Sequence, residues 1–576
     1  METRSPGLRR ARDAYALLLL SGLLAAVCPA AAQEPGVSLP APPIVSTAAR
    51  LPGDTARPVV GLVLSGGGAR GLAHIGVLEI LEDARVPVDL VVGTSMGAIV
   101  GGLFAAGVSP GEMRAWLRSV DWGDLFNDDP SYRRLTVRRK RLARDFPIGL
   151  ELGIGPRGIQ VPPGLVSGQK LNRELRRLTY PVSGVHSFDA LPIPFRAVAT
   201  DLATGDMVVL SQGDLVGALR ASMSVPGFFT PYAVEGRPMV DGGIVRNIPV
   251  DVARAMGAEV VIVVDVSGQL NAPEELRSVI DVTEQVTTIA TKAGSLAHLA
   301  ALGPADILIR PELEDISATS FERGLEAADI GRRAAGAVYG RLAPLSVSAE
   351  EFRARREAGL ARRRAPERVT YLATGSTYRR GSRNLMDRIR IRPGEALDTT
   401  RLRQDLDRIF SSGIYDLVDY RIAPAEGGDL LYIDAREKGW GPSYLRFRLA
   451  IEDDFSGGNS YSFATNLLIP EVNRGGGEIN LQAQLGDTRR LRFEFHQPLE
   501  PTRAVFVEPY AELVRLPLDL YEDGRRIARY RVTGRTAGVA LGVELGGVAE
   551  VRFRFEGGDT WARPEIGRAE LPAVEI

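Results

Sequence analysis

The chain has 576 residues and a formal net charge of −1, from 70 basic and 71 acidic residues. This length suffices for several domains, and the balanced charge argues against a nucleic-acid partner. The only cysteine is Cys28, which excludes a disulfide framework. The 45% hydrophobic content and 63 glycines suit a packed α/β core with additional β-rich segments.

The first 32 residues have the pattern of a secretory signal peptide. Ala14–Val27 is apolar but short for a membrane span, and Ala30–Ala32 offers a cleavage site before Gln33. Cys28 follows Val27, a poor match to the small residue that lipoprotein processing needs. The basic residues ahead of the apolar stretch are Arg4, Arg9, Arg10 and Arg12. We predict a signal peptide at 1–32, a linker at 33–57 and export in a Gram-negative-type cell.

No run of about twenty apolar residues follows the signal peptide, so the sequence predicts no transmembrane helix. Any insertion of the mature chain into a membrane would have to use strands.

The first expected strand, Val59–Leu64, runs directly into the glycine-rich segment Ser65–Gly71. An amphipathic helix should follow, with apolar residues at Leu72, Ile75, Leu78 and Leu81. Consecutive glycines before a helix expose backbone N–H groups, which suit an anion or a developing oxyanion.

A dinucleotide fingerprint is the alternative interpretation of this loop, because Gly66, Gly68 and Gly71 fit G-x-G-x-x-G. The next strand should then end in an acidic residue, whereas it ends in Gly93-Thr94-Ser95. A Walker A phosphate loop is excluded, since no Lys-Ser or Lys-Thr follows the glycines.

The second apolar run, Val86–Val92, leads into Gly93–Gly97, which reads G-x-S-x-G. This pentapeptide is typical of a nucleophile elbow, in which a sharp strand-to-helix turn exposes a serine hydroxyl, here that of Ser95. Glycines at both ends allow strained dihedrals and keep side chains away from a substrate.

Further along the chain, Asp241-Gly242-Gly243 follows a short apolar stretch and supplies a carboxylate. Asp201 is interpreted as a structural carboxylate or loop cap, and Asn247 as a residue that fixes the turn after Asp241. Pro226 and Phe228–Phe229 are expected to shape a wall near the site.

Four segments resemble, in order, the motifs of patatin-like phospholipases: Gly66–Gly71, Gly93–Gly97, Ala221–Phe229 and Asp241–Gly243. The resemblance implies a three-layer α/β acyl hydrolase domain over residues 58–345.

In the family, the serine of the elbow is the nucleophile and the later aspartate is its partner, so the resemblance implies these roles for Ser95 and Asp241. It also implies an oxyanion hole from the glycine loop and supporting glycines around the two catalytic positions, with no cofactor and no metal. The oxyanion residues are Gly66, Gly67 and Gly68, with Arg70 close by, and the supporting glycines are Gly93, Gly97, Gly242 and Gly243.

A histidine base is not evident, because the four histidines, His74, His186, His298 and His496, share no short motif with another catalytic candidate. A Ser–Asp dyad needs none of them. An aspartate of ordinary pKa is a weak base, so the surroundings of Asp241 must raise its pKa or hold the proton-transfer geometry tightly.

Residues 346–366 are rich in arginine and are expected to form a charged, solvated linker or helix. Residues 367–440 have strand patterns at Val369–Ala373, Val418–Ile422 and Leu430–Ile433. Between the first two, Asp398 should cap a helix whose apolar residues are Leu402, Leu406, Ile409 and Phe410. This segment resembles a single POTRA domain, the periplasmic module attached to outer-membrane barrels.

From residue 441 to 576, apolar and polar residues alternate, as in Leu445–Ile451, Leu491–His496 and Val551–Glu556. Arginines on the polar face favour an antiparallel transmembrane β-barrel over a soluble sandwich. The length allows roughly eight to ten strands, about half the barrel of the patatin-type autotransporters that the chain resembles. The last residue is Ile576, whereas those barrels end in an aromatic residue; we expect a fragment, although a reduced barrel or one completed by a second chain would also fit.

Two functions follow. The first is an exported phospholipase A-type esterase with an apolar acyl cleft, anchored in the outer membrane by its own POTRA domain and barrel, with the enzyme domain at the cell surface or secreted. Its expected partners are a phospholipid or other lipid ester, the outer membrane and the barrel assembly machinery, and a homodimer is compatible with the family. The alternative is an outer-membrane assembly or translocation protein whose patatin-like domain only binds.

Overall fold

The structure is a computed structural model. It describes residues 57–576 except 131, 133–134, 149–150, 157, 271, 276, 278, 314, 377–384, 454–458, 501–503, 524, 546–547, 567–573 and 576. The predicted signal peptide and all but the last residue of the predicted linker lie outside the described residues.

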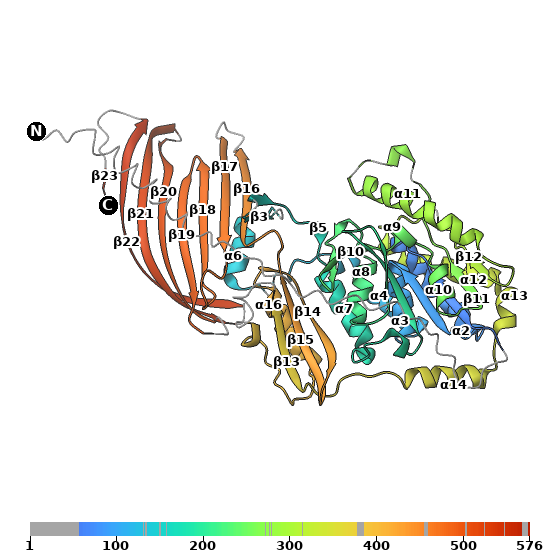
Figure 1. The fold of residues 1–576 in the computed structure, drawn as a ribbon. Coiled ribbons are helices and arrows are strands. Elements are labelled where there is room, and N and C mark those ends of the chain that lie inside the picture. Colours follow the sequence, from blue (N-terminus) through green and yellow to red (C-terminus); the bar gives the residue numbers. More distant parts are fainter. Residues whose placement is uncertain are drawn as a thin grey trace, which may run out of the picture.

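The first region is built on an eight-stranded sheet whose central strands are parallel (Figure 1). In spatial order its strands are β12 (Ile307–Ile309), β11 (Val260–Val264), β1 (Val60–Leu64), β2 (Leu90–Thr94), β6 (Phe195–Asp201), β10 (Arg237–Asp241) and β9 (Tyr232–Val234), with β7 (Met207–Leu210) beside β6. β10 runs antiparallel to β6 and β9, so the sheet is mixed at this edge.

Helices cover both faces of this sheet because the central strands are apolar on both sides. Leu62 and Leu64 of β1 point into the larger core, and Val63 points into the smaller one. The larger core is covered by α2 (Ala73–Asp83), α3 (Met96–Ala105), α4 (Pro110–Ser119), α7 (Gln169–Thr179), α8 (Leu215–Ser222) and α12 (Gly324–Ala337). The smaller core is covered by α10 (Val250–Ala255) and the end of α11 (Val279–Ala300). The α/β architecture expected for this region is confirmed.

The charged segment after the α/β region forms α14 (Ala349–Leu360), which lies along the lower edge of that region in Figure 1. The helix is not simply solvated. Gly359 is buried, and Arg363, just beyond the helix, donates to the carbonyl oxygens of Ala106 and Gly107.

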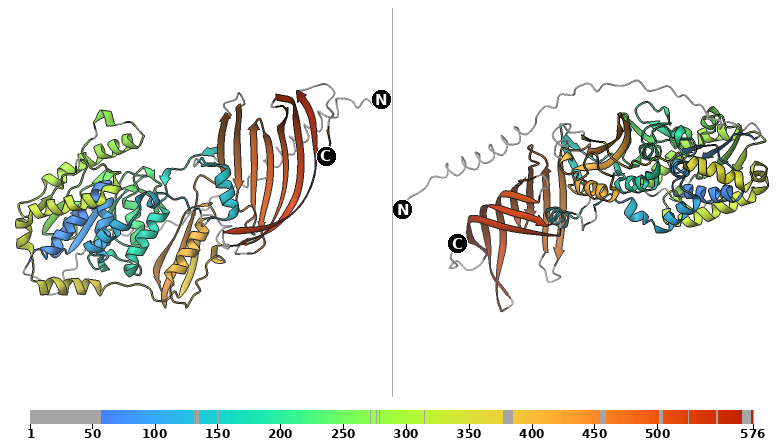
Figure 2. Two further views of the ribbon diagram at one scale, coloured as in Figure 1. Left: turned by 180° about the vertical axis from the view of Figure 1, so that it is seen from behind. Right: turned by 90° about the horizontal axis from the view of Figure 1, so that it is seen from below.

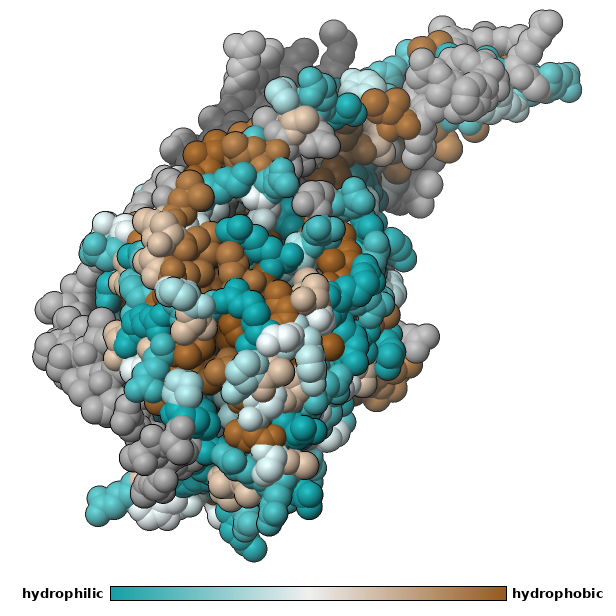
Figure 3. All heavy atoms as spheres, turned by 90° about the vertical axis from the view of Figure 1, so that its right-hand side faces the viewer, coloured by the Kyte–Doolittle hydropathy of each residue, from teal (hydrophilic) through white to brown (hydrophobic). Residues whose placement is uncertain are grey.

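At the end of the α/β region seen in Figure 3, hydrophobic residues gather in patches between hydrophilic ones.

A small α+β unit follows. Its three-stranded sheet has the order β13 (Tyr371–Ser376), β15 (Gly428–Glu437) and β14 (Tyr415–Ala425), and α16 (Thr399–Phe410) packs on it. The predicted cap is confirmed: Asp398 Oδ1 accepts the amides of Thr400 and Arg401, both at 2.9 Å. Leu402 and Ile409 are fully buried, as the helical spacing predicts.

Buried polar contacts join this unit to α7. The Arg176 guanidinium pairs with Asp419 at 2.9 Å, and Asn172 Nδ2 donates to the same carboxylate at 3.0 Å. The side-chain amide of Gln169 makes two 2.8 Å hydrogen bonds with the backbone of Val418. Paired and hydrogen-bonded charges of this kind specify one docking geometry.

The C-terminal region is a ten-stranded antiparallel sheet (Figures 1 and 2). Its order is β23 (Val574–Glu575), β22 (Ala549–Ile566), β21 (Arg525–Leu545), β20 (Val505–Glu522), β19 (Arg489–Pro498), β18 (Glu478–Gly486), β17 (Asn459–Ile469), β16 (Ser443–Asp453), β3 (Glu151–Gly155) and β4 (Gly158–Gln160). The last two strands come from within the predicted 58–345 domain. The sequence did not suggest that they would join the C-terminal sheet.

Alternation along these strands gives the sheet two different faces. One face exposes apolar side chains, including Ile451, Phe553 and Phe555, while the other carries arginines and glutamates. Across the described strands, no pairing joins β4 to β23, so the sheet is open there. Within the described part of the chain, no helix combines the length and apolarity needed to cross a bilayer.

Candidate functional site

Ser95 lies at the turn between β2 and α3, where the sequence predicts an elbow. Its backbone has φ 55° and ψ −123°, a conformation that costs energy in a non-glycine residue. The Ser95 amide donates to Ser222 Oγ at 2.9 Å, and that hydroxyl donates to the Val198 carbonyl at 2.6 Å. The strained turn is therefore held from β6 and α8.

The two glycines of the pentapeptide are required by close backbone approach. A Cβ on Gly93 would lie 2.4 Å from the Gly97 carbonyl oxygen. A Cβ on Gly97 would lie 2.3 Å from the carbonyl oxygen of Leu64, at the end of β1. Side chains at either position would push α3 away from the sheet and move Ser95.

Asp241 ends β10 and is 4% exposed. Its Oδ1 accepts the Gly243 amide at 2.7 Å, and its own amide donates to the Ser224 carbonyl at 2.9 Å. Oδ2 is buried with no partner among the described residues that meets hydrogen-bond geometry. The Ser95 hydroxyl lies near this carboxylate and favours its charged form.

Burial raises the pKa of Asp241 to about 6, because the carboxylate has lost its hydration. The Ser95 hydroxyl and the Gly243 amide lower the pKa again, but by less than burial raises it. Of the two possibilities that the sequence left open for a weak aspartate base, a raised pKa is the one that this environment provides.

The glycine loop forms a turn of 3-10 helix, η1 (Gly68–Leu72), beside the elbow. Gly68 has φ 57° and lies so close to the Ala318 carbonyl that a Cβ would approach it to 2.3 Å. Within the described residues, no hydrogen bond is recorded from the amides of Gly67 and Gly68. These two N–H groups remain available to an oxyanion.

The Gly66 amide differs, because it donates to Asn247 Oδ1 at 3.0 Å. Because this amide already has an acceptor within the protein, Gly66 does not fit the predicted oxyanion role. Of the three predicted glycine donors, Gly67 and Gly68 remain. Arg70 is 8% exposed, and its guanidinium lies against Gly268 and donates to the Ile316 carbonyl at 3.4 Å. Arg70 therefore ties the loop to the segment that follows β12.

The contacts of the histidine side chains are with residues other than Ser95 and Asp241. His74 is fully buried, and its Nε2 lies 2.9 Å from the Ser65 carbonyl oxygen. Burial lowers the pKa of His74 to about 4, so the ring is neutral near neutral pH. His298 lies near Asp251, His496 lies near Glu508, and His186 is exposed.

Asn247 has a role that the sequence analysis missed. Besides accepting the Gly66 amide, it donates through Nδ2 to Ser267 Oγ at 2.8 Å, and it is 5% exposed. It thus fixes the glycine loop against the loop that carries Asp241. In the sequence, Asn247-Ile248-Pro249 indicates only a turn after Asp241. It gives no sign that the Asn247 side chain bonds to the distant glycine loop.

Asn247→Ala is expected to lower kcat/KM for a soluble ester by about tenfold to a hundredfold, because the Gly66 amide would lose its buried acceptor and the loop would shift. The free energy of unfolding should fall by about 1–3 kcal/mol. Ester kinetics and denaturant titration measure the two effects. Asn247→Asp keeps an oxygen for Gly66 and should retain more activity; equal kinetics for alanine and wild type would contradict the tether.

Aromatic side chains cluster between the loops that border the site. Phe228 and Phe229, in β8 (Gly227–Phe229), contact Phe126 edge-on, and Phe126 contacts Phe321 at a 4.7 Å centroid distance. Trp122 adds a tilted contact to Phe321. Phe321 follows Ala318, the residue against which Gly68 packs. An apolar wall therefore joins the oxyanion loop to the segment before Asp241.

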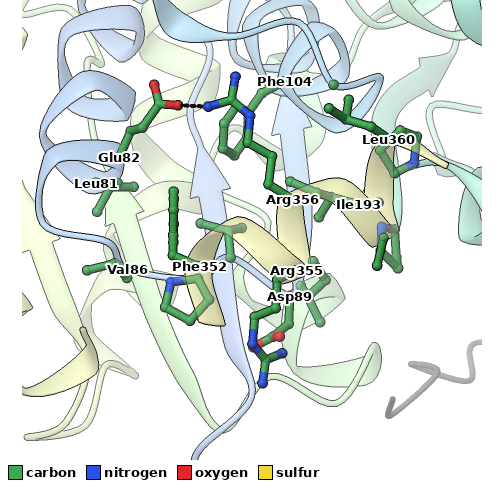
Figure 4. Close-up of a pocket in the computed structure, with 18 of the residues that line it drawn as sticks. Leu81, Glu82, Val86, Asp89, Phe104, Ile193, Phe352, Arg355, Arg356 and Leu360 are labelled. Carbon is green, nitrogen blue, oxygen red and sulfur yellow. Dashed lines mark hydrogen bonds and ion pairs between the residues drawn. The ribbon is translucent and has the colours of Figure 1, made fainter. Parts of the chain in front are cut away.

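An apolar cavity of about 190 Å³ lies elsewhere, under α14 (Figure 4). Its lining includes Leu90, at the start of β2, whereas Ser95 follows the opposite end of the same strand. Two of its lining residues, Arg356 and Glu82, form an ion pair (Figure 4). Apolar side chains along its walls include Leu81, Val86, Phe104, Phe352 and Leu360. This cavity is therefore not the acyl cleft expected beside Ser95.

A family model described as patatin-like phospholipase matches residues 62–254. Patatin-like phospholipase domain-containing protein 6 of Mus musculus is 34% identical over 212 residues, 36% of this chain and 14% of that protein. An uncharacterised NTE family protein of Mycobacterium bovis is 34% identical over 216 residues, 38% of this chain and 51% of that protein. The chain thus spans about half or less of these relatives.

Among solved structures, BamA from Haemophilus ducreyi lacking POTRA domains 1–3 has a TM-score of 0.26 and 13% identity, covering 35% of this chain and 37% of that one. A similarity this slight supports no conclusion. The family match carries more: the α/β region contains a patatin-like phospholipase domain over residues 62–254.

Proposed function

We propose that the chain is an exported lipid acyl hydrolase that cleaves carboxylic esters of phospholipids with a Ser95–Asp241 dyad. The observation that carries the proposal is a strained elbow serine near a buried aspartate whose Oδ2 has no hydrogen-bond partner among the described residues. A polar atom left in this state is expected to serve a reaction rather than the fold.

In the proposed reaction, Ser95 Oγ attacks the ester carbonyl while its proton passes to Asp241 Oδ2. The amides of Gly67 and Gly68 donate to the oxyanion of the tetrahedral intermediate. Collapse breaks the ester bond, and the alcohol, a lysophospholipid, leaves with the proton from Asp241. Water then attacks the acyl-enzyme, gives a proton to Asp241 and releases the fatty acid; that proton returns to Ser95.

The surroundings of the site support a lipid substrate. The aromatic wall of Phe126, Phe228 and Phe321 offers an apolar surface to an acyl chain. Beside the site, α11 packs against α9 (Gly243–Arg246), directly after Asp241, and runs along the upper edge of the α/β region in Figure 1. Its exposed apolar residues, at helical spacing, are Val282, Val286, Ile289 and Leu296. We propose that this face of α11 contacts the membrane that holds the substrate.

The double variant Val286→Glu, Ile289→Glu is expected to lower fatty-acid release from phosphatidylcholine vesicles by about tenfold or more, because charges would replace apolar area that enters the lipid interface. Cleavage of a soluble short-chain ester should be unchanged. Tyr339→Glu, on the remote helix α13 (Tyr339–Leu342), is the matched control. A parallel loss on both substrates with a change in oligomeric state would instead assign this face to a second copy of the chain.

For the whole chain we propose a signal peptide at 1–32, a linker at 33–57, the acyl hydrolase domain at 58–345 and a charged connector at 346–366. A POTRA-like domain at 367–440 and an outer-membrane barrel portion at 441–576 would follow. The exposed apolar face of the C-terminal sheet and its charged opposite face support membrane insertion by strands. Insertion would require the barrel assembly machinery and would locate the enzyme at the outer membrane.

The decisive test uses the full chain in a non-ionic detergent and measures fatty acid and lysophospholipid released from phospholipid vesicles. Equal amounts of the two products are expected. A folded protein that binds vesicles and releases neither product would favour the alternative, a non-catalytic patatin-like domain in an outer-membrane assembly or translocation protein.

A further inference from the structure

A helix from the patatin-like region lies against the charged face of the C-terminal sheet. This helix, α6 (Val137–Asp145), is capped by Thr136 and stands beside the strands in Figures 1 and 2. Arg138 pairs with Glu478 of β18, and the Val137 amide donates to Glu544 of β21 at 2.7 Å. Leu142 packs with Ala464 of β17.

Between α6 and the sheet there is a cavity of about 210 Å³ with a strongly basic lining. Its arginines come from the helix and from two strands, β19 and β22: Arg138, Arg139, Arg141, Arg490, Arg492 and Arg554. Its acidic lining residues are Asp145 and Glu494. Six guanidinium groups around one cavity repel one another unless negative charge lies between them.

The carboxylates within reach are already shared. Glu494 pairs with Arg492 at 2.7 Å and also accepts from Asn480 at 2.9 Å. A single carboxylate, that of Glu478, pairs with both Arg138 and Arg139, the second at 3.3 Å. Within the described part of the chain, Arg554 has no recorded ion pair. Glu512 pairs with Arg490 and Arg492, and Glu550 lies 3.7 Å from Arg141, so these carboxylates offset part of the positive charge. The lining itself has six arginines and two carboxylates.

Arg139 is the most buried arginine of this group for which a pKa shift and an unsatisfied donor atom coincide. Its side chain is 6% exposed, and Nη1 is buried without a hydrogen-bond partner among the described residues. Burial, together with the repulsion of Arg138, lowers the pKa of Arg139 to about 10, although Glu478 opposes the change. The group is still charged near neutral pH. A buried guanidinium with an unsatisfied donor and a like charge beside it is costly, and an anion in the cavity would offset that charge.

We propose that this cavity binds a phosphate group, either the phosphate of a lipid headgroup or free phosphate. The planar forks of several arginines match the oxygens of phosphate, which can accept from more than one guanidinium at once. The bound anion would link α6 to β19 and β22, and so would join the patatin-like region to the C-terminal sheet.

The test titrates inorganic phosphate into the full chain in non-ionic detergent at constant ionic strength, with thermal unfolding as the readout. Wild type should show a saturable rise in Tm that chloride does not produce. Arg554→Gln, at an exposed position, should weaken the apparent affinity by about tenfold or more. Arg144→Gln is the control, since Arg144 belongs to the same helix, is 74% exposed and does not line the cavity.

Arg139→Gln should abolish the response; if that variant does not fold, Arg554→Gln carries the test. Mixed micelles with phosphatidic acid separate the two sources: tighter binding than inorganic phosphate indicates a lipid headgroup, and equal binding indicates free phosphate. Absence of a saturable response in wild type, or identical responses in Arg554→Gln and Arg144→Gln, would overturn the proposal. Hydrolysis of a soluble ester serves as the folding check.

Discussion

Replacing Ser95 with alanine is expected to reduce fatty-acid release from phospholipid vesicles by at least about a thousandfold, because the hydroxyl proposed to accept the acyl group is removed. The variant should fold normally. Alanine keeps the backbone amide that donates to Ser222, and the glycines that position the elbow are untouched. The measurement is release of labelled fatty acid together with circular dichroism of the same samples.

Ser119→Ala is a matched control, since Ser119 is an exposed serine at the end of α4 whose hydroxyl only donates to the Trp116 carbonyl. It should hydrolyse vesicle lipids at the wild-type rate. If Ser95→Ala and Ser119→Ala were equally active, Ser95 would not be the nucleophile, and the lipid hydrolase proposal would lose its main support.

Asp241→Asn is expected to lose at least about a hundredfold in kcat while becoming more stable at pH 8. The pKa of this carboxyl is raised to about 6 in the folded protein from the ordinary 3.8. The protonated form is therefore favoured by folding. The stability that this group contributes is fully present below about pH 3.8 and is lost as pH rises through about 6.

At pH 8 the wild type thus carries a buried carboxylate whose destabilisation corresponds to about 3 kcal/mol. Asparagine removes that charge and retains an oxygen for the Gly243 amide, so the free energy of unfolding at pH 8 should rise by about 1–3 kcal/mol. Urea titrations at pH 5 and pH 8 measure it. Asp206→Asn, at an exposed aspartate in the turn before β7, should change neither stability nor activity.

The same carboxylate predicts the pH dependence of the wild type. Because the base acts only when ionised, kcat/KM for a soluble ester should rise through an apparent pKa near 6 and then level off. A profile that is flat between pH 5 and pH 8 would mean that Asp241 does not accept the serine proton.

Several elements could be predicted from the sequence alone, because the patterns that specify them are local. Apolar runs ending in glycines predicted β1 and β2, and G-x-S-x-G predicted the turn at Ser95, since only small residues permit that backbone. Asp398 and the helical spacing after it predicted α16. Alternation predicted the two faces of the C-terminal sheet.

Other features depend on contacts between residues far apart in the sequence. The Gly66 amide donates to Asn247, which is 181 residues away in the sequence. The three glycine amides of the loop, which the sequence presents as equivalent oxyanion donors, are therefore not equivalent. The pairing of β3 with β16 and the packing of α6 on the charged face move residues of the predicted enzyme domain onto another sheet. Neither segment has a pattern that distinguishes a local partner from a distant one.

The sequence by itself therefore determined the candidates for the proposed chemistry, since an elbow serine, a carboxylate and a glycine loop are specified by residue type and order. Only the tertiary structure decided how that chemistry can operate. The raised pKa of Asp241 comes from desolvation by surrounding elements. Gly67 and Gly68 are the proposed oxyanion donors because the Gly66 amide is bonded to the distant Asn247. Burial and long-range hydrogen bonds are properties of the packed chain, which no local pattern encodes.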